Sequence, residues 1–317
     1  MGDVGSMEPK VSIIIPNWNG LEDTIECLES LKKISYQNYE VIVVDNGSRG
    51  KDAEVLRCRF SDYIHLIQND KNLGYAGGVN VGIRYVQSNY KPDFVLLLNN
   101  DTVVAADFLT RMVESAITDN SIGIVGLEAY QYGLSTRAKQ GIVIKIRMLK
   151  TWIACIGINQ INIWHFSSYN RDAAEGCCQL VRNDVIEKIG YFDESYFCYW
   201  EDSDFIFRVK EAGYRIVCTP EAKIWHKVSQ TSRHISGFAC YYFHRNKIRF
   251  MRKHATRWQY GWFIIYNFLF YFEFMLVYYL IFRVSPRAVL SFLRGVRDGL
   301  MNRDTAARLY SDNRSQD

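Results

Sequence analysis

Several familiar signatures are missing from this 317-residue sequence. It has no Cys-x-x-Cys pair, and its eight cysteines lack the spacing of zinc ligands. It also has neither a Gly-x-Gly-x-x-Gly fingerprint nor a phosphate-binding loop with its lysine, which argues against dinucleotide oxidation and P-loop phosphoryl transfer. No signal peptide is recognisable, so we expect reduced, mostly buried cysteines in a cytosolic protein.

The composition is that of a folded globular protein, but its charge is unevenly distributed. Apolar residues make up 48% of the chain, charged residues 23% and aromatic residues 15%, which excludes a disordered, collagen-like or disulfide-stapled protein. Within the net charge of +4, residues 1–232 carry −5 and residues 233–317 carry +9. This division predicts an acidic body with a basic C-terminal region.

Short apolar runs alternate with segments of helical periodicity through the acidic body. Such alternation predicts an α/β fold, with a Rossmann-like, mostly parallel central sheet flanked by helices. Residues 133–170 fit either a hairpin or a mobile substrate loop. The expected strands span 11–15, 41–45, 63–67, 94–98, 121–126 and 214–218, and the expected helices span 21–31, 76–87, 183–189 and 201–212.

Two aspartates, Asp45 and Asp101, follow expected strands, at the edge where open α/β sheets bind ligands. The Asp45 carboxylate could accept the N3–H of uracil or thymine, or it could cap the turn at Asn46-Gly47. Asp101 could hold a divalent cation that also binds a nucleotide diphosphate, or it could belong to a polar turn.

Seven segments follow one another in a specific order: Val11–Asn19, Val43–Ser48, Asn72–Ile83, Leu98–Thr102, Gly190–Glu194, Trp200–Phe205 and Ile224–His226. Together they resemble the motifs of family 2 glycosyltransferases with a GT-A fold, especially the rhamnosyltransferase-like branch. The resemblance covers roughly residues 10–255. It implies the transfer of a sugar from a nucleotide-activated donor.

The resemblance places the nucleoside and sugar of the donor near the early strand ends and the glycine-rich segment. Glycines there would permit close backbone approach to the donor, although a flexible helix start would also explain them. The implied donor-binding residues are Pro16, Asn17, Trp18, Asp45, Gly74, Gly77, Gly78, Asn80, Asn99 and Asn100.

A divalent cation, Mg²⁺ or Mn²⁺, is implied as cofactor, with Asp101 and His226 as its ligands. Asn99 stands where the family's metal motif commonly has an aspartate, so Asp101 is the single anionic ligand of this motif. A histidine satisfied within the core is the alternative for His226. Arg208 and Arg245 are further candidates for phosphate contacts, or they belong to solvated helix faces.

The resemblance assigns the general base of an inverting transfer to Asp202, with Glu201 and Trp200 orienting the acceptor. A single in-line attack needs a base that removes the proton of the acceptor hydroxyl. The neighbouring carboxylates Glu201 and Asp204 should raise the pKa of Asp202. Alternatively, this acidic cluster only favours the start of a helix.

Residues 262–282 form an apolar segment interrupted only by Asn267 and Glu273, and eleven of its 21 residues are aromatic. Its length could span a bilayer. However, the aromatic content, the central Glu273 and the basic residues on both flanks favour a segment that lies on the membrane or dips into it. A true span, or an aromatic helix packed in a core or an oligomer interface, is the alternative. The acidic body disfavours nucleic-acid binding.

We therefore expect three parts: residues 1–9, a flexible N-terminus resembling an expression-vector remnant; residues 10–232, a GT-A catalytic domain; and residues 233–317, a helical membrane-associating appendage. The expected enzyme transfers a sugar from a UDP- or dTDP-linked donor to a hydroxyl acceptor, such as a polyprenyl-diphosphate-linked glycan, at the cytoplasmic membrane face. Similarity at Gly77-Gly78-x-Asn80 alone favours rhamnose. A non-catalytic nucleotide-sugar-binding assembly subunit and a nucleotidyltransferase are the alternatives, and homo-oligomerisation stays open.

Overall fold

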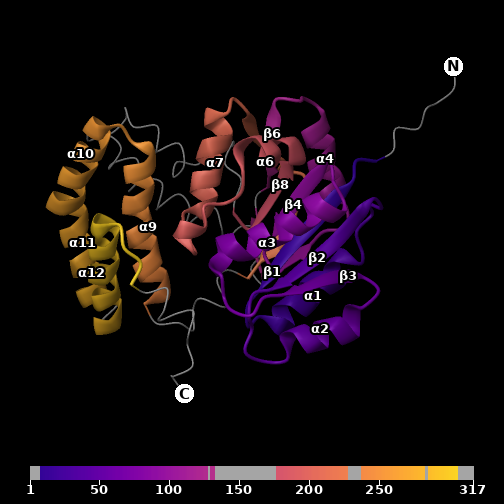
Figure 1. Cartoon of the computed structure of the whole chain (residues 1–317), viewed down its shortest axis with the longest axis horizontal. Coiled ribbons are helices and arrows are strands. Elements are labelled where there is room, and N and C mark those ends of the chain that lie inside the picture. The colour runs from indigo at the N-terminus through magenta and orange to yellow at the C-terminus, as the bar shows by residue number, and fades with distance from the viewer. Residues whose placement is uncertain (1–7, 128, 133–175, 228–236, 283–284, 306–317) are drawn as a thin grey trace.

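The structure is a computed structural model, and it describes residues 8–127, 129–132, 176–227, 237–282 and 285–305. The segment 133–170 and most of the expected N-terminal extension lie outside these residues. In the described part, an α/β body stands beside a separate group of C-terminal helices (Figure 1).

The body is built on a seven-stranded sheet in the order β3-β2-β1-β4-β8-β6-β9. Strands β1, β2, β3 and β4 run parallel to one another, as do β6 and β9, whereas β8 is antiparallel to both of its neighbours. The predicted α/β fold is therefore confirmed, with one reversed strand that the sequence did not indicate. The strands are β1 (Val11–Asn17), β2 (Tyr39–Asp45), β3 (Ile64–Gln68), β4 (Phe94–Leu98), β6 (Ile122–Gly126), β8 (Cys178–Arg182) and β9 (Arg215–Cys218).

Helices cover both faces of this sheet, because its central strands are apolar on both sides. Alternate residues of β1 point to opposite faces: Ile13 and Ile15 join one apolar cluster, and Ile14 joins the other. The first cluster includes residues of α1 (Leu21–Leu31), α2 (Asp52–Phe60) and α4 (Phe108–Ile117). The second includes residues of α3 (Gly74–Asn89), α6 (Asn183–Ile189) and α7 (Glu201–Glu211).

A smaller sheet brings two distant parts of the chain together. Strand β10 (Ile224–His226) pairs antiparallel with β5 (Thr102–Val104) and parallel with β7 (Ala129–Gln131). The register sets His226 opposite Thr102, which directly follows Asp101. This pairing places the imidazole beside the end of β4.

The C-terminal helices form a layer beside α7, at the left of Figure 1. Helix α9 (Phe238–His254) packs along α12 (Pro286–Met301), and both contact a long helical run outside them. That run joins α10 (Arg257–Tyr266), the π-helical η3 (Asn267–Tyr271), α11 (Phe272–Val277) and the π-helical η4 (Tyr278–Phe282). A capping box at Thr256 and Gln259 starts it.

The long run is apolar but mostly exposed. Residues 257–281 are long and apolar enough to cross a membrane, by length and composition alone, and only 6% of their most apolar stretch is buried. The segment is therefore not a helix enclosed within the core of this chain.

Candidate active site

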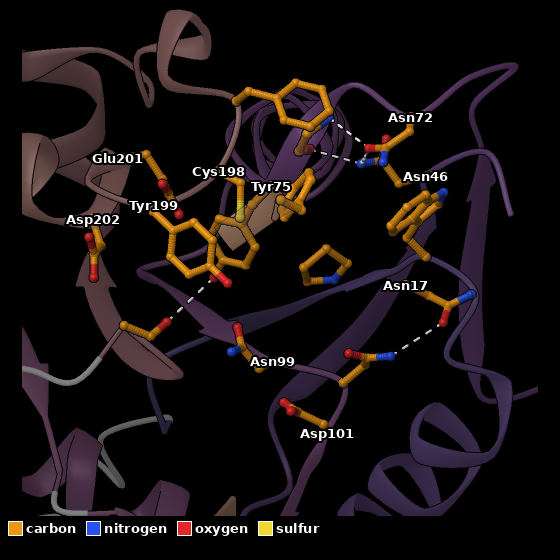
Figure 2. Close-up of a pocket in the computed structure, with 17 residues that line it drawn as sticks. Asn17, Asn46, Asn72, Tyr75, Asn99, Asp101, Cys198, Tyr199, Glu201 and Asp202 are labelled. Carbon is orange, nitrogen blue, oxygen red and sulfur yellow. Dashed lines mark hydrogen bonds between the residues drawn. The ribbon is translucent and has the colours of Figure 1, made fainter. Parts of the chain in front are cut away.

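A cavity of about 280 Å³ opens at the carboxyl ends of β1 and β4, between the sheet and the start of α7 (Figure 2). Nine predicted site residues line it: Pro16, Asn17, Trp18, Gly74, Asn99, Asn100, Asp101, Glu201 and Asp202. The other six, Asp45, Gly77, Gly78, Asn80, Trp200 and His226, are not among its lining residues. The structure thus places some of the predicted donor residues, one of the two predicted metal ligands and the predicted base around one cavity.

Asn17 connects the cavity to the predicted base-recognition residue Asp45. The Asn17 amide donates to Asp45 Oδ1 at 3.0 Å and to Asp52 Oδ2 at 3.1 Å, and its oxygen accepts from Thr24 at 2.9 Å. Asp45 is buried behind Asn17 and also accepts from the backbone N–H of Ser48. In this structure Asp45 therefore orients the side chain of Asn17. Recognition of a nucleobase by Asp45 stays a prediction.

Asn46 and Asn72, which sequence reasoning missed, fix the glycine-rich segment at the cavity edge. The Asn46 amide donates to Asn72 Oδ1 at 3.1 Å and to the Gly74 carbonyl at 2.8 Å. Gly74 has a φ of +76°, and a Cβ there would lie 2.3 Å from the Phe197 carbonyl oxygen. Glycine is required at this position because a neighbouring loop approaches so closely.

The other residues predicted in the glycine-rich segment, Gly77, Gly78 and Asn80, do not line the cavity. A Cβ at Gly77 would meet Leu73, and one at Gly78 would lie 3.0 Å from the Asn46 amide, so both permit local packing. The Asn80 side chain donates to the Phe192 carbonyl at 2.9 Å and accepts its N–H at 3.0 Å. Asn80 therefore ties α3 to the segment that precedes α7.

The residues predicted to hold a metal meet at the end of β4. Nε2 of His226 lies 3.0 Å from Oδ1 of Asp101, an ion-pair distance, although the contact lacks hydrogen-bond geometry. Buried Oδ1 of Asn99 has no hydrogen-bond partner among the described residues, and Figure 2 shows Asn99 and Asp101 projecting toward the cavity. An imidazole nitrogen, a carboxylate and an unsatisfied amide oxygen gathered in this way fit a divalent cation. Within the described ranges no cluster of three or more His, Cys, Asp or Glu ligands forms, so further ligands would come from the donor or water.

The carboxylates at the start of α7 have raised pKa values. Burial, with a smaller contribution from Asp202, raises the pKa of Glu201 from about 4.5 to about 8. Burial also raises the pKa of Asp202, although the backbone N–H of Ser203 donates to its Oδ1 at 2.6 Å and opposes that shift. Gly176 makes room for this carboxylate, because a Cβ there would lie 2.6 Å from Asp202 Oδ2.

The predicted influence of Asp204 on Asp202 is wrong. Asp204 is fully buried and contacted by two cations and an imidazole: Arg208 Nε lies at 2.8 Å, and Lys253 Nζ and His254 Nε2 both lie at 2.7 Å. Although burial opposes it, hydrogen bonds from these groups hold the pKa of Asp204 well below its usual range. These contacts compensate its charge, and burial, rather than the charge of Asp204 or of Glu201, raises the pKa of Asp202.

The two arginines suggested as phosphate contacts are engaged inside the protein. Arg208 binds Asp204 and the carbonyls of Ile189 and Tyr191. Arg245 is fully buried and forms an ion pair with Asp304. Neither is among the residues that line the cavity. Because Arg245 is fully buried, the alternative of a solvated helix face is wrong for this residue.

An aromatic loop between Tyr196 and Trp200 closes the cavity opposite Asn17, and no sequence motif predicted it. Phe197, Tyr199 and Trp200 have φ values of 65°, 65° and 74°, which cost non-glycine residues about 1–3 kcal/mol each. Phe197 and Tyr199 face the cavity, whereas the Trp200 ring packs 5.2 Å from that of Phe250. The other lining residues missed from sequence are Tyr75, Gly176, Cys198 and Phe238.

Comparison with known proteins assigns the sequence to a family. The model of glycosyl transferase family 2 matches residues 12–178, more than half of the chain. The chain belongs to glycosyl transferase family 2. The match ends before Asp202 and His226, so their placement rests on the structure rather than on this match.

Individual relatives are also glycosyltransferases. The chain is 27% identical over 247 residues to the low-salt glycan biosynthesis hexosyltransferase Agl10 of Haloferax volcanii, covering 76% of this chain and 75% of that one. It is 28% identical over 241 residues to the rhamnosyltransferase WbbL of Escherichia coli, covering 70% and 85%.

A solved structure confirms the GT-A fold. The mannosyltransferase PcManGT of Pyrobaculum calidifontis, in complex with GDP-Man and Mn²⁺, has a TM-score of 0.59 and 15% identity. The similarity covers 94% of this chain and 89% of that one. At this identity the likeness supports the fold alone.

Proposed function

We propose that this glycosyltransferase moves a sugar from a UDP- or dTDP-linked donor to a hydroxyl acceptor, with inversion at the anomeric carbon. The observation that carries the proposal is that Asp101 and Asp202 line one and the same cavity. The similarity to a rhamnosyltransferase supports rhamnose as the sugar. Because the structural neighbour was solved with GDP-Man, guanosine donors belong in the test as well.

The donor diphosphate would lie against the end of β4. Asp101 and His226 are the protein ligands available for Mg²⁺ or Mn²⁺, and the Mn²⁺ in the structure of the Pyrobaculum mannosyltransferase supports a divalent cation. When bound, the cation would neutralise the charge that develops on the leaving diphosphate. Asn99 brings a neutral amide to the same edge, where its nitrogen can donate to a phosphate oxygen without adding negative charge. The Asn100 amide nitrogen instead donates to Thr24 Oγ1 at 3.0 Å and to Asn17 Oδ1 at 3.3 Å.

Asp202 would act as the general base. The acceptor oxygen attacks the anomeric carbon as the bond from that carbon to the diphosphate oxygen breaks, and Asp202 takes the hydroxyl proton. A raised pKa suits this role, because a base works best when its pKa is close to the working pH. Glu201, with a pKa of about 8, is protonated at neutral pH and can donate a hydrogen bond to the acceptor.

The acceptor is proposed to be lipid-linked, and the enzyme to work at the cytoplasmic face of the membrane. The exposed apolar run 257–281 supports this location, together with the charge of +9 over residues 233–317. A polyprenyl-diphosphate-linked sugar would present its hydroxyl at that surface.

The proposal is tested by incubating the purified full chain with UDP-, dTDP- and GDP-sugars, with Mg²⁺, Mn²⁺ or EDTA. We expect metal-dependent release of UDP or dTDP, and loss of that metal dependence together with most activity in Asp101→Asn. An exposed exchange on α4, Glu114→Gln, is the control and should behave as wild type. Release of GDP alone, or release unaffected by EDTA, would contradict the donor or the metal assignment.

A further inference from the structure

Asn246 on α9 makes an unusual set of contacts with the aromatic loop. Its amide nitrogen lies 2.8 Å from the Tyr196 carbonyl oxygen, 2.8 Å from that of Cys198 and 2.7 Å from that of Tyr199. Three acceptors therefore share the two hydrogens of one side chain. Asn246 is fully buried and is not among the residues that line the cavity, so its contacts are with the loop rather than with a ligand.

Arg245 fixes the orientation of this amide. Its Nε donates to Asn246 Oδ1 at 2.8 Å, while its Nη2 donates to the carbonyls of Ser195 at 2.8 Å and Tyr196 at 3.0 Å. Rotating the Asn246 amide by half a turn would set its oxygen against three carbonyl oxygens and its nitrogen against a guanidinium. The side chain therefore has one favourable orientation, with its donors toward the loop.

The loop held in this way has a backbone that does not form readily by itself. Phe197, with φ 65° and ψ −63°, is the centre of a γ-turn in which the Cys198 N–H donates to the Tyr196 carbonyl at 2.8 Å. Tyr199 and Trp200 are also left-handed, and α7 begins at the next residue. Left-handed non-glycine residues persist where surrounding contacts over-determine them, and such sites cluster near function.

We propose that Asn246 is a positioning residue that, oriented by Arg245, holds the left-handed loop so that the next turn presents Asp202 to the acceptor. The inference rests on the proposed role of Asp202. It assigns to α9, a helix of the C-terminal layer, the task of shaping a catalytic wall. Asn246 itself touches neither donor nor acceptor.

The test compares Asn246→Ala with Tyr241→Phe in the full chain. Both remove a buried polar contact of α9, but the Tyr241 hydroxyl donates to Asp298 of α12, and phenylalanine keeps its ring. For Asn246→Ala we expect kcat to fall by at least about tenfold, while the affinity for UDP measured by calorimetry changes by less than about threefold. For Tyr241→Phe we expect a lower melting temperature and a kcat within about twofold of wild type.

The pH profile separates positioning from a general loss of stability. Among the residues that the structure describes, the titratable neighbours of Asp202 are Glu201 on the same turn, Tyr75 of α3 and Cys198 of the loop, none of which is a cation. Loosening the loop would let water reach Asp202, lower its pKa and move the acid limb of kcat/KM to lower pH in Asn246→Ala. Tyr241→Phe should leave that limb unchanged.

Wild-type kcat and an unshifted acid limb in folded Asn246→Ala would overturn the inference and reduce Asn246 to a stabilising contact. If Asn246→Ala does not fold, Arg245→Lys takes its place under the same criteria, since lysine keeps the charge beside Asp304 and loses the planar fork. Asp202→Asn is measured in parallel. Its full activity would contradict the proposed function, whereas an inactive Asp202→Asn beside an unaffected Asn246→Ala contradicts the positioning role alone.

Discussion

At the scale of residues, two adjacent carboxyl groups occupy different environments. Glu201 Oε2 is buried without a hydrogen-bond partner in the part of the chain that the structure describes, and its pKa rises to about 8. Asp202 receives hydrogen bonds from Ser203, which offset part of the effect of burial on its pKa. At neutral pH this difference favours a protonated Glu201 beside an ionised Asp202, a division suited to a donor and a base.

Asp202→Asn should abolish turnover and leave donor binding intact. An amide keeps the shape of the side chain but cannot take a proton, and loss of a general base costs about 10²–10⁴-fold in rate. Sugar transfer and UDP affinity, measured on the same preparation, check the prediction. Asp184→Asn, at a side chain on α6 that is 54% exposed, is the matched control. Equal loss of UDP affinity and rate in Asp202→Asn would point to a damaged donor site.

Glu201→Gln should change the alkaline side of the pH profile. In wild type, activity should fall as the pH rises through about 8, because the protonated Glu201 that donates to the acceptor is lost. Glutamine donates at every pH, so its alkaline limb should flatten while the acid limb, set by Asp202, stays. A pH series of kcat/KM checks this, and an unchanged alkaline limb would contradict the role of Glu201.

The stability of the protein gives an independent check on Glu201. Because its folded pKa lies above the unfolded value, the folded state binds the proton more tightly, and stability falls as the pH rises from about 4.5 to about 8. The melting temperature of Glu201→Gln, relative to wild type, should therefore increase across that window. Parallel melting curves would contradict the raised pKa.

The sequence motifs indicated many of the residues that line the cavity, but not the contacts that set the pKa values of its carboxyl groups. The motif positions of Asn17, Asp101 and Asp202 led to residues that do line one cavity. The predicted influence of Asp204 failed because its charge is compensated by contacts from two directions. Arg208 lies four residues along the same helix, a spacing that the sequence could have indicated. Lys253 and His254 lie about 50 residues away and reach Asp204 through packing between α7 and α9, which periodicity does not reveal.

At the scale of elements, the start of β8 determines the space available to Asp202. Gly176 precedes β8, and it lies so close that a Cβ would be 2.6 Å from Asp202 Oδ2. Gly176→Ala should displace the carboxylate and lower kcat by about 10–100-fold, with a small effect on stability. Activity and melting temperature of the variant check this.

Gly261→Ala is the matched control for that exchange. A Cβ at Gly261 would meet nothing within 4 Å, and its helix α10 lies outside the body. Alanine there should leave activity unchanged and slightly favour the helix. A Gly176→Ala enzyme with wild-type kcat would show that Asp202 can move without cost.

Element order followed from apolar periodicity, whereas pairing between distant elements did not. The apolar runs of β1, β2 and β4 predicted strands, and these predictions are confirmed. Strand β8 was not expected, and neither was its antiparallel pairing with β4 and β6. The resemblance linked His226 with Asp101, but their contact is made by the three-residue pairing of β5 with β10, and so short a pairing leaves no periodic pattern.

At the scale of the whole molecule, the basic C-terminal region is also a region with an exposed apolar surface. The C-terminal helices hold the basic excess, and their outer run exposes Leu269, Phe270 and Phe274 by 62%, 63% and 58%. On the inner side, Lys247 Nζ of α9 lies 3.3 Å from the centre of the Tyr271 ring, so the run packs against α9, where burial lowers the pKa of Lys247 to about 7. Apolar groups outside and cations on the flanks together suit an anionic bilayer.

The exposed face of this run should therefore control binding to membranes. Replacing Leu269, Phe270 and Phe274 together by serine removes apolar area that contacts little of the protein, so the fold should persist while co-flotation with phosphatidylglycerol vesicles is largely lost. Ile117→Ser, at a side chain 56% exposed on α4, is the matched control and should float like wild type. Sugar transfer to a soluble acceptor should be unchanged in both variants, because neither change touches the cavity.

Salt and alkaline carbonate then distinguish how the run meets the bilayer. Surface binding aided by basic residues should weaken as ionic strength rises, because screening shortens the reach of charges, and carbonate should release the protein. A spanning helix would resist both treatments, since its hold on the bilayer is the buried apolar area of about 20 residues. Flotation of the triple serine variant equal to wild type would contradict membrane contact through this face and would transfer that role to the basic residues alone.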